Sequence, residues 1–469
     1  MTYRYLPIVL LTIVTSTTHA QNLNSAYFVD DYKYRHMMNP AFDNESSYFS
    51  FPALGNITIN TKGNFGYNAV VLPNPLALQE NQKSMTTFMN PYIDNSTALE
   101  GFSNGNNRIV GNITVALISV GFNGFGGYNT IDINSRSSFG LSIPYELFEF
   151  AKNTGNKTYE IGDISAEALS YFEIGLGHSH KVCDKLRLGA KMKILMGIGR
   201  ADLRMENVKA DLSDDNRWLV QGGAVIDVSM KNFNFKEEVK QYRNTNKGNY
   251  QRVNDVKIDK FGIDGLGMAF DLGGIFKANQ DWTVSAALLD VGLIKWHNDI
   301  QAQNIYNQFE FDGFHDTSVR DDRPSEYGTL ENQSDNYLDQ IANFVNVQNR
   351  DDQGSRTTGI GATVNIGASY NLPSYRKLTL GVLSSTRING DYSWTEARLS
   401  TNWSPLNWLN GGINIAISSF TTSFGWGLNI HPLGYNLFIG MDHTFGKLSK
   451  EGIPLNSNAS ASIGMNITW

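Results

Sequence analysis

The sequence predicts an all-β protein: a transmembrane, antiparallel, up-and-down β-barrel of about 14 strands with an N-terminal hatch segment in its lumen. Three observations lead to this prediction. Apolar and polar residues alternate along runs of about 9–12 residues, the length that a tilted strand needs to cross a bilayer. No run comes near the roughly 18 apolar residues of a transmembrane helix. The chain also ends on an alternating segment, 461–469, whose last residue is Trp469.

The C-terminal segment has one apolar and one polar face, because successive side chains of a strand point to opposite sides. Its apolar face carries Trp469, Ile467, Met465, Ile463 and Ala461. The pattern resembles the C-terminal signal of Gram-negative outer-membrane barrels, which the barrel-assembly machinery recognises. This resemblance implies that Trp469, Ile467 and Met465 form an assembly signal. It also implies a location in the outer membrane of a Gram-negative bacterium.

Residues 1–20 are typical of a secretory signal peptide. Arg4 provides the positive charge, residues 6–14 form a short apolar core, and Thr18, His19 and Ala20 form a small-x-small cleavage site. We therefore expect cleavage near Ala20. Gln21, and not a cysteine, directly follows this site, which argues against a lipoprotein anchor.

The composition of the chain agrees with a membrane barrel. Charged residues make up 18% of the chain, below the usual quarter, while 44 glycines and 12% aromatic residues are high values. The mean hydropathy is −0.29, as expected when lumen and lipid faces alternate along each strand. The net charge of −7 argues against nucleic acid as a partner, and a single cysteine, Cys183, excludes an intrachain disulfide framework.

The alternating segments give a predicted topology. The expected strands lie near 110–123, 127–144, 167–181, 185–202, 216–231, 263–279, 281–292, 356–371, 375–388, 391–403, 408–419, 422–432, 434–446 and 458–469. Long loops near 232–262 and 293–355 then fall on odd-to-even connections and face outward. Two connections, 145–166 and 203–215, are too long for the short periplasmic turns expected there. They indicate either a miscounted strand or elaborations on the periplasmic side.

The segment 21–108 differs from the rest of the chain, because it is rich in Asn, Pro and Gly and shows little alternation. We expect three parts: a signal peptide (1–20), a hatch or plug (21–108) and the barrel (109–469). Asn39, Pro40, Ala41 and Phe42 could form an ordinary turn. They also resemble the Asn-Pro-Ala box of fatty-acid-transporter-like barrels, whose N-terminal segment folds into the lumen. Phe42 stands where those transporters usually have Gly.

Four charges are expected in the lumen. If Phe172 and Ile174 face lipid, Glu173 faces inward beside Arg187, Lys191 and Lys193 on the neighbouring strand. These charges could hold the hatch, line a polar path or neutralise one another.

No motif predicts catalysis. Residues 177–181 resemble a nucleophile elbow, but Lys181 replaces the final Gly, and His178 and His180 have no third ligand nearby in the sequence. We therefore expect a protein that is not an enzyme, without cofactor or metal.

Short motifs spread over the chain resemble an uncharacterised family of outer-membrane barrels common in Bacteroidetes; they lie at 39–42, 51–56, 173–177, 188–193 and 288–292. The plan of that family is similar to the long-chain fatty-acid transporters. The resemblance implies a passive transporter or channel for small apolar or amphipathic solutes. The alternative is a non-conducting scaffold that docks surface or secretion partners through its outer loops. Expected partners are outer-membrane lipid, the assembly machinery, and a hydrophobic small molecule or surface protein.

Overall fold

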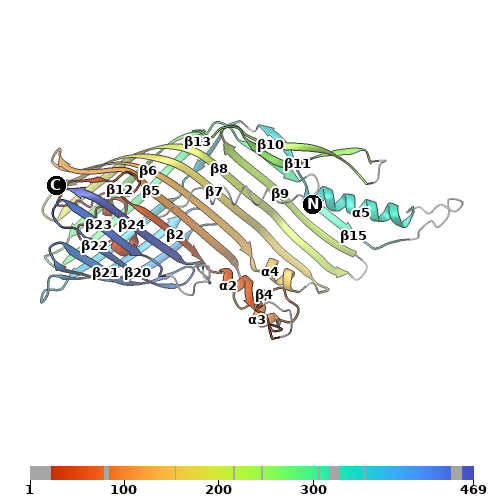
Figure 1. Cartoon of the computed structure of the whole chain (residues 1–469), viewed down its shortest axis with the longest axis horizontal. Helices are drawn as coiled ribbons and strands as arrows, with labels where there is room; N and C mark the ends of the chain where they lie inside the picture. Colours follow the sequence, from red (N-terminus) through yellow and green to blue (C-terminus); the bar gives the residue numbers. More distant parts are fainter. Residues whose placement is uncertain are drawn as a thin grey trace.

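The computed structural model describes residues 23–78, 84–153, 155–214, 217–243, 247–304, 307–315, 328–352, 354–444 and 457–469, so the expected signal peptide lies outside the described residues. The chain forms a closed antiparallel β-barrel, which confirms the predicted fold class (Figure 1). The wall has 14 strand positions, as predicted. In order they are β1 (Tyr48–Ser50) with β2 (Ile57–Gly63), β5 (Asn106–Gly124), β6 (Gly127–Pro144), β7 (Thr158–Lys181), β8 (Leu186–Asp214), β12 (Gly265–Lys277), β13 (Trp282–Trp296), β17 (Arg356–Gly359) with β18 (Ala362–Asn371), β19 (Leu378–Ile388), β20 (Trp394–Leu406), β21 (Leu409–Ser418), β22 (Thr422–Ile430), β23 (Tyr435–Met441) and β24 (Ala459–Thr468).

The barrel closes through β2, which pairs with both the last strand and β5. Ile59 lies opposite Ala461 of β24 on one side and opposite Ile113 of β5 on the other. The prediction that all of 21–108 forms a hatch is therefore wrong for β1 and β2, which belong to the wall. Each of the two alternating segments is short, and Pro52 and Asn56 lie between them, so they are a weak signal in the sequence.

The predicted strand 216–231 is also corrected. It forms β9 (Arg217–Met230), which pairs with the outer half of β8 (Met230 opposite Gly199), while the inner half of β8 pairs with β12. A wall strand gained at β2 and one lost at β9 keep the total unchanged. The two connections that seemed too long are explained in the same way. The β6–β7 connection is 145–157 and lies at the loop end, while residues 203–214 are the outer half of β8, so both were signs of a miscounted strand.

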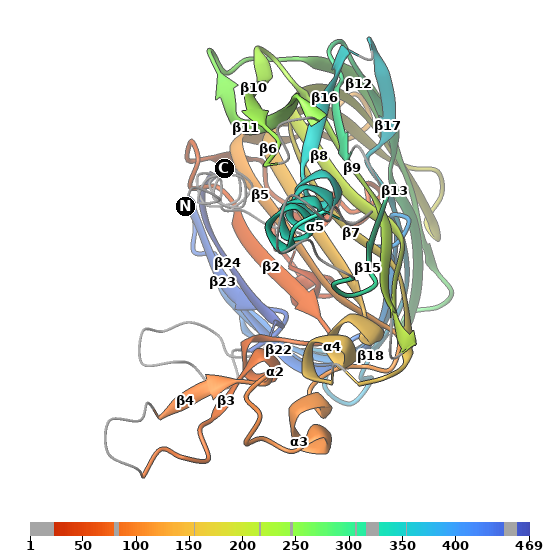
Figure 2. The same ribbon diagram turned by 90° about the vertical axis from the view of Figure 1, so that its right-hand side faces the viewer.

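The two ends of the barrel differ. The turn end carries the short connections, such as 125–126 and 278–281, together with the C-terminus. The loop end carries the long connections, including the predicted loops 232–262 and 293–355. An extension projects beyond the rim of this end. It consists of β9, β10 (Phe233–Gln241), β11 (Asn249–Ile258), β14 (Ile300–Asn304), β15 (Gln308–Phe311), α5 (Leu330–Val345) and β16 (Val347–Asp352). Figure 2 shows α5 in front of the barrel mouth.

The wall has an apolar outer face and a polar inner face. In β20, Leu399 is 62% exposed on the outside, while Arg398 and Ser400 are buried on the inside. Four exposed tryptophans gather at the turn end: Trp282, Trp403, Trp408 and Trp469. An indole prefers the boundary between lipid and water, so these side chains form an interfacial belt. No helix in the described ranges has the length and apolar character needed to cross a membrane.

The C-terminal residue joins the first wall strand to the last. Trp469 exchanges two backbone hydrogen bonds with Ser47, at 3.1 and 3.2 Å. The side chains of Trp469 and Ile467 are exposed on the outer face, and the sulfur of Met465 lies 3.6 Å from the Tyr435 hydroxyl. The role of these three residues in assembly stays a prediction.

Candidate functional site

Residues 23–47, which we call the plug, lie inside the barrel and are mostly buried. They include two short 3-10 helices, η1 (Asn24–Ala26) and η2 (Arg35–Met37). The plug packs its aromatic and sulfur-containing side chains against inward-facing wall residues; this cluster includes Tyr27, Tyr32, Tyr34, Met38, Tyr128, Leu383 and Phe438. Of the predicted hatch 21–108, the structure thus places residues 23–47 in the lumen.

The predicted hatch box contacts the wall through the side chain of Asn39. The side-chain amide of Asn39 donates to the backbone oxygens of Gly274 in β12 (3.3 Å) and Ala286 in β13 (3.2 Å). Its oxygen accepts from the backbone N–H of Ala41 at 2.9 Å. Phe42 is buried beneath the guanidinium of Arg35, 4.0 Å from the ring centroid.

Two facing glycines make room for this box. Gly189 of β8 lies opposite Gly273 of β12. A Cβ atom on Gly273 would stand 2.0 Å from the Asn39 oxygen, and one on Gly189 would stand 2.2 Å from the Pro40 oxygen. Neither distance is tolerated, so the small residues at these two positions are a condition for plug docking.

We expect Gly189→Ala to loosen the plug without opening the wall, because the added methyl group collides with the backbone of Pro40. Overpacking of this kind costs about 1–3 kcal/mol. The measurement is the rate of tryptic cleavage after Lys33 and Arg35 in folded protein, followed by mass spectrometry. Gly274→Ala is the control, because its Cβ would meet only Leu188, at an ordinary 3.4 Å. Equal protection of the plug in the two variants would contradict the prediction.

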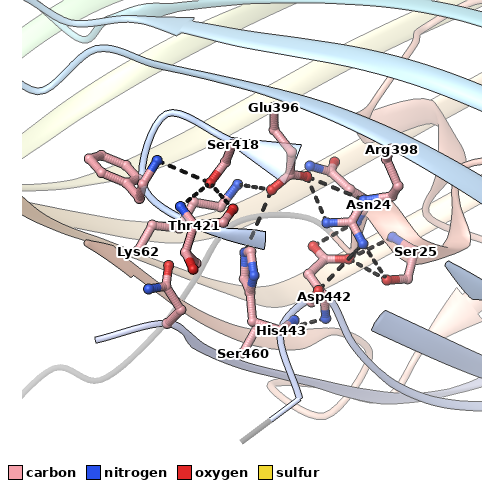
Figure 3. A network of polar contacts seen from close by, with 12 residues as sticks. Asn24, Ser25, Lys62, Glu396, Arg398, Ser418, Thr421, Asp442, His443 and Ser460 are labelled. Atoms are coloured by element: carbon pink, nitrogen blue, oxygen red, sulfur yellow. Dashed lines mark hydrogen bonds and ion pairs between the residues drawn. The ribbon is translucent and has the colours of Figure 1, made fainter. Parts of the chain in front are cut away.

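The start of the plug is held by a second set of contacts (Figure 3). The carboxylate of Asp442 accepts hydrogen bonds from the backbone N–H groups of Asn24 (2.9 Å) and Ser25 (2.6 Å). Arg398 reaches both Ser25, with 3.1 Å between Nη1 and Oγ, and the carboxylate of Glu396, with 2.6 Å between Nη2 and Oε1.

Glu396 also links this set of contacts to the first wall strand. Lys62 of β2 donates to the Glu396 carboxylate at 2.8 Å. Two cations, Lys62 and Arg398, and two carboxylates, Glu396 and Asp442, therefore neutralise one another around the start of the plug, as buried charges require.

A third set of contacts couples the middle of the plug to the wall. Lys191 forms an ion pair with Asp132 (2.6 Å) and donates to Nδ1 of His36 (3.2 Å). The other ring nitrogen of His36 lies 2.8 Å from the Tyr48 hydroxyl, which contacts Ser119 at 2.7 Å. Burial lowers the pKa of His36 to about 3, so the ring stays neutral and its Nδ1 can accept a hydrogen bond from the Lys191 ammonium group.

Lys193 and Glu173 belong to a second cluster of paired charges in the lumen. Lys193 lies 2.5 Å from Asp290 and 2.7 Å from Asp271, whereas its distance to Glu173 is 3.9 Å. Glu173 pairs instead with Arg136 at 3.0 Å. Asp290 adopts a left-handed backbone conformation (φ +59°) in a bulge of β13, where Leu289 and Asp290 together lie opposite Asp271 of β12.

The four predicted lumen charges all lie inside the barrel but have different partners. Arg187 contacts Asp43 of the plug at 2.7 Å and so holds the plug, while Lys191, Lys193 and Glu173 pair mainly with residues that the sequence analysis missed. These partners are Asp132, Arg136, Asp271 and Asp290. The sequence contains a signal that could have identified Asp132, Asp271 and Asp290 as lumen residues. Each is a single carboxylate between two apolar neighbours on an alternating strand, so it points inward when they face lipid.

Two cavities lie in the lumen beyond the plug. The narrow cavity, about 50 Å³, has room for a few water molecules. Its lining includes Asn24 and Met38 of the plug and Tyr171, Arg136, Asp290, Asn365, Arg387 and Trp394 of the wall. The wide cavity, about 450 Å³, is nearer the loop end and is lined by residues such as Glu167, Arg200, Asp202, Arg356 and Asn389. Ser138 lines both cavities, so they are adjacent.

The structure shows no arrangement that suggests metal chemistry in the part of the chain that it describes. No group of three His, Cys, Asp or Glu side chains there could hold an ion. The rings of His178 and His180 stack with 5.8 Å between centroids, and His178 hydrogen-bonds to Asn129.

Comparisons with known proteins give a family and several matching solved structures. A model described as a family of unknown function (DUF5723) matches residues 40–442, which confirms the resemblance to an uncharacterised family. No curated protein matches the chain. The Ralstonia pickettii toluene transporter TbuX is 8% identical, with 97% of this chain and 95% of that chain covered and a TM-score of 0.40. A Pseudomonas aeruginosa FadL homologue is 8% identical, with coverages of 96% and 98% and a TM-score of 0.39. The translocator domain of the autotransporter NalP from Neisseria meningitidis is 10% identical, with coverages of 91% and 90% and a TM-score of 0.31.

Proposed function

The chain belongs to DUF5723, a family of unknown function, and we propose that it is a gated outer-membrane transport barrel for a small polar or amphipathic solute. The plug closes the barrel in the conformation described above. The observation that carries this proposal is that two polar cavities adjoin a plug which, apart from its chain connection to β1, only non-covalent contacts hold in place.

Apart from the pair between Trp469 and Ser47, the last residue of the plug, the wall does not depend on the plug for its backbone hydrogen bonds. Each of the 14 strand positions of the wall pairs with two wall neighbours, so the ladder stays complete if the plug moves. The contacts of the plug with Asp442, Arg187 and the two glycines are local, and water can replace them one by one. A conformational change of the plug is therefore less costly than any opening of the wall.

The lining of the cavities defines the class of solute. Amides, hydroxyls and paired charges line both spaces, and Tyr171 and Trp394 add two aromatic surfaces to the narrow cavity. Polar groups of this kind fix a solute by hydrogen bonds, while aromatic rings cover an apolar part. We therefore favour a polar or amphipathic solute over the wholly apolar one that the sequence resemblance also allowed.

Locking the plug tests the proposal. The side chains of Ser25 and Asn414 are in contact, with 3.4 Å between oxygens, so Ser25→Cys with Asn414→Cys should form a disulfide in a Cys183→Ser background. We expect arabinose-driven swelling of proteoliposomes under reducing conditions, and loss of swelling after oxidation. The control pair, Thr386→Cys with Thr395→Cys, joins two wall strands at side chains 3.1 Å apart and should leave the rate unchanged. Equal rates in the locked and unlocked states would contradict a gating plug.

A second candidate is the scaffold, which one observation favours. Helix α5 exposes Leu338, Ile341 and Val345 at helical spacing, while its polar residues Gln333 and Asp339 are buried against the extension. Exposed apolar stripes mark protein contacts. A scaffold would bind its partner equally well with the plug locked, which distinguishes it from a transporter.

A further inference from the structure

A small unit at the loop end lies outside the barrel. It contains α2 (Tyr67–Val70), β3 (Val71–Pro73), β4 (Met85–Thr87) and α3 (Asn95–Leu99), and we call its described residues, 64–78 and 84–105, the appendage. Figure 2 shows β3, β4 and α3 projecting sideways from the wall, away from the mouth. The sequence analysis assigned this segment to the lumen, and its position outside is a correction.

The appendage is built on the lipid-facing side of the wall. Ile109 of β5 shares its face with Ile113, which lies opposite the exposed Ile59 of β2, and it is paired with Leu141 of β6. Onto this outer face pack four phenylalanines, three from the appendage and one from α4 (Tyr145–Lys152): Phe65, Phe88, Phe102 and Phe148. The appendage therefore covers wall surface that lipid would otherwise cover.

Lys152 fixes the orientation of the appendage. The ammonium group of this α4 residue donates to the backbone oxygens of Asn90 (2.7 Å) and Ile93 (2.6 Å). The segment 84–94 therefore contacts the barrel at two places, through the apolar side chain of Phe88 and through the hydrogen bonds from Lys152. Its exposed side chains are held in one position relative to the wall.

The outer surface of the appendage is apolar and poor in charge. Tyr67, Met85, Met89 and Tyr92 are each about half exposed or more. Asp94 and Glu100 are the charged residues of its described part, and Asp94 is occupied in capping α3, where it accepts from the Thr97 N–H at 2.9 Å. Apolar side chains with aromatic rings and few charges are the composition of segments that lie in a membrane interface.

We propose that the appendage is a membrane-interface anchor, which inserts Tyr67, Met85, Met89 and Tyr92 into the lipid layer beside the loop end. The occupant is lipid, because the surface continues the lipid-facing wall and projects sideways over the same side of the barrel. Insertion removes the apolar surface of these side chains from water, which is favourable. It also limits the tilt of the barrel in the bilayer. This proposal is independent of transport.

Depth-dependent quenching tests the anchor. In a Cys183→Ser background, Met89→Cys and Tyr92→Cys are each labelled with an NBD fluorophore and reconstituted in phosphatidylcholine vesicles containing doxyl-labelled phosphatidylcholine. Ile413→Cys, on the outer face of β21, gives the reference for full lipid contact. We expect the two appendage labels to reach at least about half of the quenching at Ile413→Cys, as for side chains buried in the interface.

Val239→Cys provides the matched control, because this β10 residue is 63% exposed and Tyr92 is 67% exposed, but β10 belongs to the extension. Its label should show no lipid quenching and full quenching by aqueous iodide. If the Met89 and Tyr92 labels behave like the Val239 label in vesicles, the appendage does not contact lipid and the proposal is overturned. Protection from iodide without lipid quenching would overturn it too, since a protein partner would then cover the surface. Slower migration of boiled than unboiled samples confirms that each barrel is folded.

Discussion

Removal of residues 24–44 should convert the closed barrel into a steadily conducting pore. These residues fill a lumen that 14 strands make wide, and the inward-facing wall residues behind them are mostly polar. Water can therefore take the place of the plug and solvate Asp442, Arg187 and Lys191, which the plug now partners. We expect the mean single-channel current in planar bilayers to rise at least about tenfold over the full chain.

The control for this deletion is one of similar length outside the lumen. Removal of residues 234–257, which form most of the β10–β11 hairpin, should leave the current unchanged, because that hairpin lies beyond the rim. Heat-dependent gel migration shows whether each variant forms a barrel. A folded barrel that lacks residues 24–44 and still does not conduct would mean that the wall side chains alone seal the lumen.

Loss of the Asp290 charge should destabilise the barrel strongly. The Asp290 carboxylate lies 2.5 Å from Lys193, 3.2 Å from Arg136 and 3.5 Å from Arg387. With Asp271 and Glu173, the cluster holds three positive and three negative charges, so Asp290→Asn leaves three against two. An uncompensated buried charge costs about 3–5 kcal/mol. Asn is the chosen replacement because it tolerates the left-handed backbone at this position.

The free energy of unfolding in urea, measured on protein refolded into lipid vesicles, checks this prediction. Asp281→Asn is the control, because its partner Arg376 lies 3.1 Å away at the exposed turn end and such pairs contribute about 0–1 kcal/mol. Adding Lys193→Met to Asp290→Asn should recover part of the loss, since the charges then balance again. A loss for Asp290→Asn no larger than that for Asp281→Asn would show that water reaches the cluster.

The sequence by itself determined the class of fold, the number of strands and the face of most side chains. These features depend on local periodicity: alternation with a period of two places Leu399 outside and Arg398 inside whatever the strand pairs with. Alternation also predicted the inward position of Lys191 and Lys193, whereas the box at Asn39 rested on its resemblance to the box of fatty-acid-transporter-like barrels.

The tertiary structure decided which segments complete the wall and which residues pair across the lumen. Residues 57–63 become a strand because β5 and β24 leave one unpaired position between them, and residues 64–105 stay outside because Ile109 and Leu141 offer them an apolar surface. The partners Asn24 and Asp442, or Lys62 and Glu396, lie more than 300 positions apart in the chain. Such pairs depend on barrel closure, which brings the first and last strands together, and no local pattern in the sequence records that closure.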